Sequence, residues 1–275
     1  MFGAMPYLDI ASDFRPYYEI HDATDPWEAS ETIFFIHGFA ESSQAYYGWL
    51  PNLSRRFRLV TYDLRGLGRN KPVDASFEYS SDLMAKDAAH VMEKLANGPC
   101  HVVAAKSGSI IASRLAVNRP DLVKSLILAC PVGAPTNDDW VGHIEQHGVR
   151  SYARWTMPSR LGLGASDAML DWWSDLMGKT APSTAYAYFR WVTKTQPIED
   201  LKKIDCPILA IMTTPPPEID IGSGQLTATN FKLAASQAQV VVIPHDCYHI
   251  SAVQPDACAR EALAFIASLS QPLKT

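Results

Sequence analysis

Short apolar runs recur along the chain, and each has the length and composition of a strand that is buried on both faces of a sheet. Amphipathic segments with helical spacing separate several of them, namely 83–96, 110–118 and 255–269. Strands that alternate with helices predict an α/β fold with a doubly wound, mostly parallel sheet. The six predicted strands are Thr32–Ile36, Arg58–Tyr62, His101–Ala105, Ser125–Cys130, Ile208–Met212 and Gln239–Ile243.

One long region breaks this alternation. Residues 134–198 contain no strand-like run, but they show helical patterns such as 149–155 and 168–177. We therefore predict a helical cap at 134–198, inserted into a core formed by 1–133 and 199–275. The region holds five of the seven tryptophans of the chain, and most of its aromatic residues should pack inside the cap. A minority should line an apolar pocket under this lid, for which we name Trp155, Tyr186 and Trp191.

Composition narrows the class of protein. The chain has 275 residues, 47% of them apolar and 19% charged, which is typical of a globular protein. Its net charge of −5 lacks the basic excess of a nucleic-acid-binding protein. No apolar run approaches the roughly 18 residues that a membrane helix requires, and the amino-terminal segment lacks the basic start of a secretion signal.

The five cysteines are odd in number and show no CxxC spacing, which argues against a disulfide framework or a zinc cluster. We therefore expect a cytoplasmic protein that acts on a small molecule without a cofactor or metal. We expect it to bind neither nucleic acid nor membrane. The sequence leaves open whether it forms a homodimer.

In a parallel sheet, ligands bind beyond the carboxyl ends of the strands, so the residues that follow each predicted strand carry the chemistry. The first strand ends in His37-Gly38, and glycine permits a sharp turn that can direct a backbone N–H into a cleft. This segment resembles the HG-x loop of the α/β-hydrolase family. The resemblance implies that the amide of Phe39 belongs to an oxyanion hole, whereas His37 is structural.

A second segment, Asp63 to Arg69, resembles the D-x-R-G-x-G-x-S loop of the same family. Asp63 and Arg65 should stabilise a turn through charge-assisted hydrogen bonds. The resemblance covers roughly residues 30–130 and 200–270. It implies an α/β-hydrolase fold.

The turn after the strand at 101–105 resembles the nucleophile elbow of that family, a strained strand-turn-helix that presents its side chain over the sheet. Two registers fit. Ser107 would have small residues at both flanks, Ala105 and Ser109, but no glycine. Lys106 would have Gly108 in the expected place. The run G-x-S-x-G-G…A…A…P also matches the following helix, at Ala112, Ala116 and Pro120, only when Lys106 stands where the family has serine.

The two registers predict different chemistry. Under both, the amides of Phe39 and Ser107 would stabilise an oxyanion. Ser107 would act as an ordinary nucleophile. A lysine that attacked an ester would form a stable amide, so Lys106 suits a Schiff base with a ketone, or a cationic role beside an enolate or carboxylate. Burial and a helix amino terminus should both lower the pKa of Lys106.

The segment His245 to Ile250 follows the last predicted strand and resembles the loop that carries the family's general base. His249 fits that role, ahead of the helix that begins at Pro255. The expected place of the acid instead holds a proline-rich loop. Its two carboxylates, Glu218 and Asp220, are the candidate acids, but no residue stands where the family has its aspartate.

These residues predict a cofactor-independent hydrolase with an incomplete triad that acts on a small apolar ester, lactone or β-diketone, with His249 as the base. Within this hypothesis, hydrolysis by Ser107 competes with C–C cleavage or decarboxylation assisted by Lys106. A ligand receptor that has lost its nucleophile is the alternative from another class. A cofactor-free oxygenase of the same fold is a third, because it would also tolerate a missing nucleophile.

Overall fold

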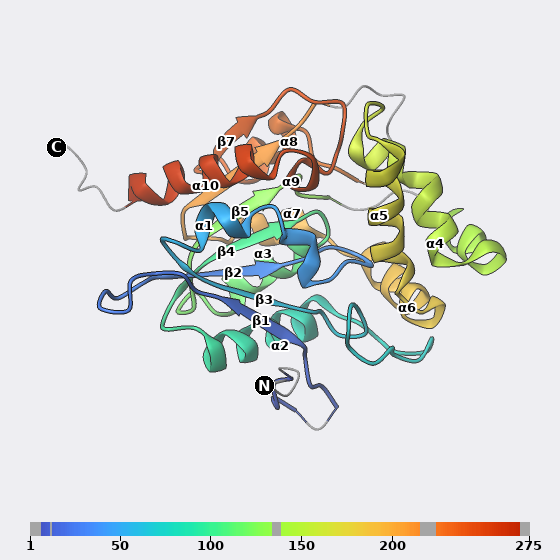
Figure 1. Cartoon of the computed structure of the whole chain (residues 1–275), viewed down its shortest axis with the longest axis horizontal. Helices are drawn as coiled ribbons and strands as arrows, with labels where there is room; N and C mark the ends of the chain where they lie inside the picture. Colours follow the sequence, from blue (N-terminus) through green and yellow to red (C-terminus); the bar gives the residue numbers. More distant parts are fainter. Residues whose placement is uncertain (1–6, 12, 134–138, 215–223, 270–275) are drawn as a thin grey trace.

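The computed structural model describes residues 7–11, 13–133, 139–214 and 224–269, and its centre is a seven-stranded sheet in the order β1-β3-β2-β4-β5-β6-β7. Only β1, which pairs with β3, is antiparallel; the other pairs are parallel. Figure 1 shows this sheet between two groups of helices. The strands are β1 (Tyr18–His21), β2 (Thr32–Ile36), β3 (Arg58–Tyr62), β4 (Cys100–Ala105), β5 (Val123–Ala129), β6 (Ile208–Met212) and β7 (Gln239–Val242).

The central strands are buried on both faces, and their side chains alternate between two hydrophobic cores. Phe34 and Ile36 of β2 join the core with α2 (Ser81–Leu95) and α3 (Gly108–Asn118). Ile33 and Phe35 point the other way, into the core with α1 (Leu50–Leu53) and α10 (Pro255–Leu269). This period-two alternation fixes the register of the strands and therefore aligns their carboxyl ends at one edge.

Four helices lie between β5 and β6, and three of them (α4, α5 and α6) stand beside the carboxyl ends of the strands (Figure 1). Helix α4 changes direction at Gly148, where φ is 80°. This part of the chain is helical, as its sequence pattern predicts; the exact division into core and cap at 134–198 stays a prediction. The four helices are α4 (Asp139–Leu161), α5 (Asp167–Gly178), α6 (Pro182–Val192) and α7 (Pro197–Leu201).

The predicted fold class is confirmed, and all six predicted strands are present to within two residues at each end. The sequence pattern missed β1, because its residues are half-buried or exposed and lack an apolar run. It also missed the short elements η1 (Ser43–Tyr46), α8 (Ala228–Ala234) and α9 (Ile250–Val253).

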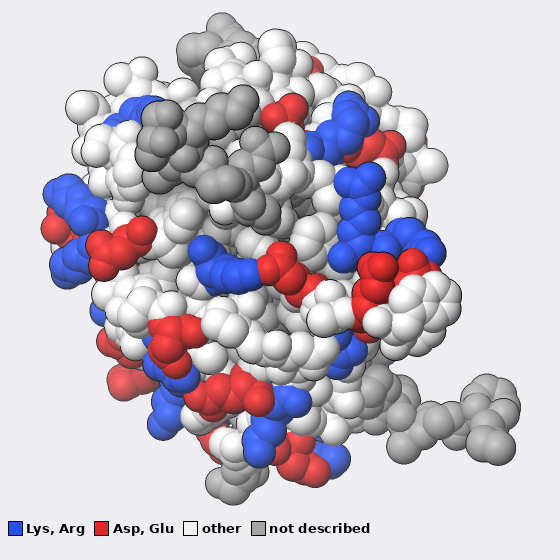
Figure 2. All heavy atoms as spheres, turned by 90° about the vertical axis from the view of Figure 1, so that its left-hand side faces the viewer, with Lys and Arg blue, Asp and Glu red and all other residues white. Residues whose placement is uncertain are grey.

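Charged residues of both signs are interspersed on the face that Figure 2 shows, and neither sign gathers in a single large patch there. Ion pairs at the surface of the protein include those of Arg119 with Asp121 and Glu93. Within the described ranges, no helix combines the length and apolarity needed to span a bilayer.

The close approach of α3 to β2 depends on Gly108. A Cβ at this position would lie 2.5 Å from the carbonyl oxygen of Ile36 and 2.7 Å from that of His37, so backbone would have to move. We expect Gly108→Ala to lower the free energy of unfolding by about 2 kcal/mol or more, as overpacking does. The thermal midpoint should fall by roughly 4–8 °C.

Gly142→Ala in α4 is the matched control, because nothing lies within 4 Å of its added Cβ. Thermal unfolding followed by circular dichroism compares the two variants. Equal midpoints for both variants and the wild type would contradict the close approach.

Candidate active site

The turn between β4 and α3 places Lys106 in a strained backbone conformation. β4 ends at Ala105 and α3 begins at Gly108, and Lys106 between them has a φ of 49°. A non-glycine residue in this left-handed region costs free energy and persists only where the surroundings impose it. Ser107, the next residue, has ordinary helical angles of −64° and −18°. The strained residue of this turn is therefore Lys106.

The side chain of Lys106 is buried, with 5% of its surface exposed, and its ammonium pairs with a carboxylate that the sequence analysis did not single out. Lys106 Nζ donates to Oε1 of Glu41, a residue in the loop after β2 that is 1% exposed. Burial, followed by the charge of Arg160, lowers the pKa of Lys106 to about 8, although the Glu41 charge opposes the shift.

Glu41 connects three elements of the site. Its Oε1 also lies 2.9 Å from Nε2 of His249, and its Oε2 accepts the backbone N–H of Gly38 at 2.9 Å. Burial alone would raise the pKa of this carboxyl. The charge of Lys106, together with the hydrogen bonds from His249 and Lys106, outweighs burial and holds the pKa well below its usual range. Glu41 is therefore a buried anion shared by a lysine and a histidine.

His249 lies in the loop after β7, directly before α9, and is 2% exposed. Its Nδ1 lies 3.1 Å from Oγ of Ser251, and its ring packs edge-on against Trp173. Burial, and then the Lys106 charge, lower the pKa of His249 to about 4. The imidazole is therefore neutral near pH 7, and the buried group consists of an ammonium, a carboxylate and a neutral imidazole.

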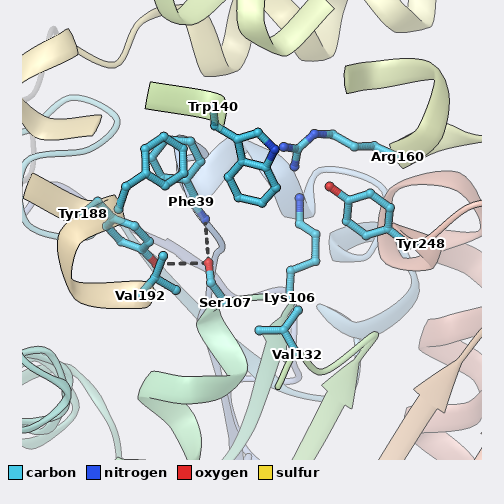
Figure 3. A pocket seen from close by; sticks show the side chains of 10 residues that line it. Phe39, Lys106, Ser107, Val132, Trp140, Arg160, Tyr188, Val192 and Tyr248 are labelled. Atoms are coloured by element: carbon cyan, nitrogen blue, oxygen red, sulfur yellow. Dashed lines mark hydrogen bonds between the residues drawn. The ribbon is translucent and has the colours of Figure 1, made fainter. Parts of the chain in front are cut away.

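Ser107 makes different contacts. Its Oγ accepts the backbone N–H of Phe39 at 2.9 Å and the hydroxyl of Tyr188 at 3.0 Å (Figure 3). Within the described residues, no hydrogen bond joins Ser107 Oγ to His249. A serine nucleophile needs such a base within hydrogen-bond reach. In this conformation the serine hydroxyl also occupies the Phe39 amide that would bind an oxyanion.

A small cavity of about 50 Å³ lies over this turn. A space of this size holds a group of only a few heavy atoms. Figure 3 shows Lys106, Arg160 and Tyr248 together on one side of the cavity, with Ser107 and Tyr188 on the other. The lining residues are Phe39, Lys106, Ser107, Val132, Trp140, Arg160, Tyr188, Phe189, Val192 and Tyr248. Glu41 and His249 are not among them, so Lys106 is the member of the buried group that faces the cavity.

The three aromatic residues predicted for the substrate pocket are not among those that line this cavity. Trp155 is 57% exposed and stacks on His143, and the indole of Trp191 donates to Oγ of Ser81 at 3.2 Å. Tyr186 is only half-buried. It is not among the residues that line the cavity.

Other predicted residues are accounted for as follows. Glu218 and Asp220, the candidate acids, lie outside the described residues. His37 bridges two loops, since its Nε2 accepts the N–H of Leu64 at 2.9 Å. Arg65 makes two hydrogen bonds to the carboxylate of Asp87. Within the described ranges, no three His, Cys, Asp or Glu side chains gather in an arrangement that could hold a metal ion.

A usable signal for Glu41 was present in the sequence. It is the only Asp, Glu, Lys or Arg between Glu31 and Arg55, and it follows a buried strand. A carboxylate alone in such an apolar stretch is costly to bury without a partner. The analysis looked for the acid where the family carries it and therefore missed a carboxylate from another loop.

The chain belongs to the alpha/beta hydrolase fold family, whose model matches residues 31–184. Among curated proteins it is 30% identical over 111 residues to a pimeloyl-[acyl-carrier protein] methyl ester esterase from Aeromonas hydrophila. That match covers 40% of this chain and 42% of the esterase, so the chain spans about two fifths of the relative's length.

Two solved structures share the fold over nearly their whole length. The enol-lactonase from Burkholderia xenovorans LB400 superposes with a TM-score of 0.79 at 17% identity, covering 95% of this chain and 100% of that one. A thermophilic esterase from Thermogutta terrifontis gives 0.78 at 17% identity, covering 94% of each chain. At this level of identity, the likeness concerns the fold.

The lowered pKa of His249 makes stability depend on pH. Because the pKa falls from 6.5 in the unfolded chain to about 4 in the folded one, the unfolded chain binds more protons between these values. The free energy of unfolding should therefore decrease as the pH drops below about 6.5. In His249→Gln this contribution disappears, so the wild type should lose more stability than the variant between pH 7.5 and pH 5.

Urea unfolding at these two pH values measures the difference. Glu41 adds its own loss only below its unfolded pKa of 4.5, which lies outside this window. His90→Gln, on α2 and not fully buried, should behave as the wild type does. The assignment fails if His249→Gln retains the complete pH dependence.

Proposed function

We propose that the protein is a cofactor-independent enzyme that cleaves a C–C bond in a small carbonyl compound of the β-diketone class, with Lys106 as the reacting group. One observation carries this proposal. The ε-amino group of Lys106 faces the cavity from the strained turn, with Glu41 and His249 hydrogen-bonded behind it. On this proposal, Lys106 takes the place that the family gives to its serine nucleophile. Helices α4, α5 and α6 would serve as the lid.

The electrostatics suit an amine nucleophile. With a pKa of about 8, Lys106 is partly neutral at weakly basic pH, and only the neutral amine can attack a carbonyl. Loss of its charge also removes a cation that lowers the pKa of His249, so the imidazole becomes a better base at that moment. Glu41 bridges the two nitrogens and connects the proton donor to its acceptor.

The reaction balances without an external oxidant or reductant. The amine adds to one carbonyl of the diketone and expels water, which gives a protonated imine. Water adds to the second carbonyl, and the C–C bond to the central carbon breaks. Its electron pair enters the imine to form an enamine, and a carboxylic acid leaves. Protonation and hydrolysis of the enamine release a ketone and regenerate Lys106, so that one water is consumed overall.

Ester or lactone hydrolysis by Ser107 is the second candidate. Ser107 lines the same cavity beside the Phe39 amide, and the relatives named above are an esterase and an enol-lactonase. This candidate requires Ser107 to leave Tyr188 and Phe39 and to reach His249 as its base. Because Lys106 already stands between the cavity and the imidazole, we rank hydrolysis by serine second.

Covalent trapping tests the proposal directly. We expect incubation with pentane-2,4-dione and cyanoborohydride to add one reduced ketone to the protein, on Lys106. Intact-mass spectrometry followed by peptide mapping measures the adduct. Lys106→Met should reduce it at least about 100-fold, because none of the other described residues that line the cavity carries an amine that could form the imine.

Ser107→Ala is the matched control and should still form the adduct. A fluorophosphonate probe separates the second candidate, since labelling of Ser107 in place of trapping at Lys106 would identify a serine esterase. Saturable binding of the diketone with no adduct and no product would instead indicate a ligand receptor. Consumption of dissolved oxygen would indicate an oxygenase.

The pH dependence of trapping should follow the charge of Lys106. In the wild type, the initial rate should rise with pH through a midpoint near 8, as the ammonium becomes an amine. In Glu41→Gln, the midpoint should move to lower pH, because the Glu41 charge holds the lysine proton in place. Glu31→Gln, which removes a carboxylate paired with Lys124, should leave the midpoint unchanged. A higher midpoint in Glu41→Gln would contradict the pairing.

A further inference from the structure

Arg160, near the end of α4, is a buried cation that lines the cavity. It is 5% exposed, and its Nε and Nη2 donate to neutral oxygens, those of Thr156 (3.0 Å) and Tyr152 (2.9 Å). Its guanidinium also lies over the rings of Tyr152 and Tyr248. Within the described ranges, no carboxylate forms an ion pair with it, and Nη1 has no hydrogen-bond partner.

Arg65 provides a comparison within the same molecule. It is also 5% exposed, but Asp87 and Asp13 both pair with it, at 2.8 Å each. Buried charges are ordinarily paired in this way, because an uncompensated charge in the interior is costly. Arg160 has no such carboxylate partner among the described residues, and its side chain lines the cavity (Figure 3).

The charges around the cavity do not balance. Lys106 and Arg160 each carry a positive charge at pH 7, whereas Glu41 supplies one negative charge and His249 is neutral. Glu41 already accepts from Gly38 and Lys106 and contacts His249. The described part of the site therefore carries an excess positive charge that one further anion would neutralise. A carboxylate matches the forked geometry of a guanidinium.

We propose that Arg160 binds a carboxylate of the substrate, and that this carboxylate lies next to the carbonyl that reacts with Lys106. The substrate class is then a 2,4-dioxo acid, a β-diketone with a carboxylate on one carbonyl. The reaction of this unit rests on the function proposed above, but the anion site rests on Arg160 alone. A cavity of about 50 Å³ suits a compact group such as a 2-oxo acid unit.

This assignment also fixes which bond breaks. Loss of the carboxylate as carbon dioxide would move negative charge away from a buried guanidinium, so Arg160 opposes decarboxylation. Cleavage between the central carbon and the distal carbonyl leaves the ion pair intact throughout. The products are then a carboxylic acid and a 2-oxo acid, with one water consumed.

Oxamate tests the anion site without any reaction, because it carries a carboxylate beside an amide carbonyl that does not form an imine. We expect calorimetry to detect binding to the wild-type protein. Arg160→Gln should weaken it about 10- to 100-fold, the effect of losing charge-assisted hydrogen bonds. Arg160→Lys should lose less, since it keeps the charge but not the fork. Arg154→Gln, on the same helix with surface partners Asp167 and Asp171, should bind as the wild type does.

A matched pair of ketones tests the substrate class. We expect 2,4-dioxopentanoate to form the Lys106 adduct at a KM at least about 10-fold lower than pentane-2,4-dione, and Arg160→Gln should remove this preference. Circular dichroism verifies the fold of each variant. If Arg160→Gln does not fold, Arg160→Lys and the wild-type preference decide the question.

The outcomes separate the two proposals. Oxamate affinity that is the same in wild type and Arg160→Gln, or equal KM values for the acid and the neutral diketone, would overturn the anion site even if Lys106 forms its adduct. Oxamate binding that depends on Arg160, with no adduct from either ketone, would support the anion site and refute the Lys106 chemistry.

Discussion

The site depends on the burial of a lysine ammonium against a single carboxylate. The Lys106 charge is the largest influence that keeps Glu41 ionised in this interior, and the Glu41 charge in turn opposes the loss of the Lys106 proton. Breaking such a buried pair by removing one partner typically costs about 3–5 kcal/mol. The two residues come from loops after neighbouring strands, β2 and β4, so the parallel pairing of these strands brings their side chains together.

The Lys106–Glu41 pair also influences the protonation state of His249. His249 contacts Glu41 through Nε2, yet burial, and then the nearby ammonium, lower its pKa and keep it neutral near pH 7. The three groups therefore respond to each other, and a change of protonation at one alters the proton affinity of the other two. In a serine enzyme of this fold, the hydroxyl is neutral and the histidine carries the transferred proton. In this protein the positive charge is carried by Lys106, at the turn between β4 and α3.

The fold was predictable from the sequence because buried parallel strands are continuous apolar runs. The position of Lys106 was predictable in part, since Gly108, Ala112 and Ala116 favoured that register. Glu41 and Arg160 were not found. The isolation of Glu41 in an apolar stretch indicated a buried carboxylate but not its partner Lys106, 65 positions away. Arg160 lines a cavity to which residues far away in the chain, such as Phe39 and Lys106, also contribute. The edge strand β1 was not predicted, because its stability comes from its pairing with β3 rather than from an apolar run in its sequence.

The backbone of Arg160 makes a further contact with the loop that carries the imidazole. Its carbonyl accepts the N–H of His249 at 3.0 Å, and three residues later the N–H of Leu163 donates to Asp246 at 2.8 Å. The end of α4 is thus joined to that loop at two points. A ligand larger than the present cavity can enter only if the covering helices shift, and a shift at this end would displace the arginine and the histidine as one unit. Entry of such a ligand is therefore coupled to the position of His249.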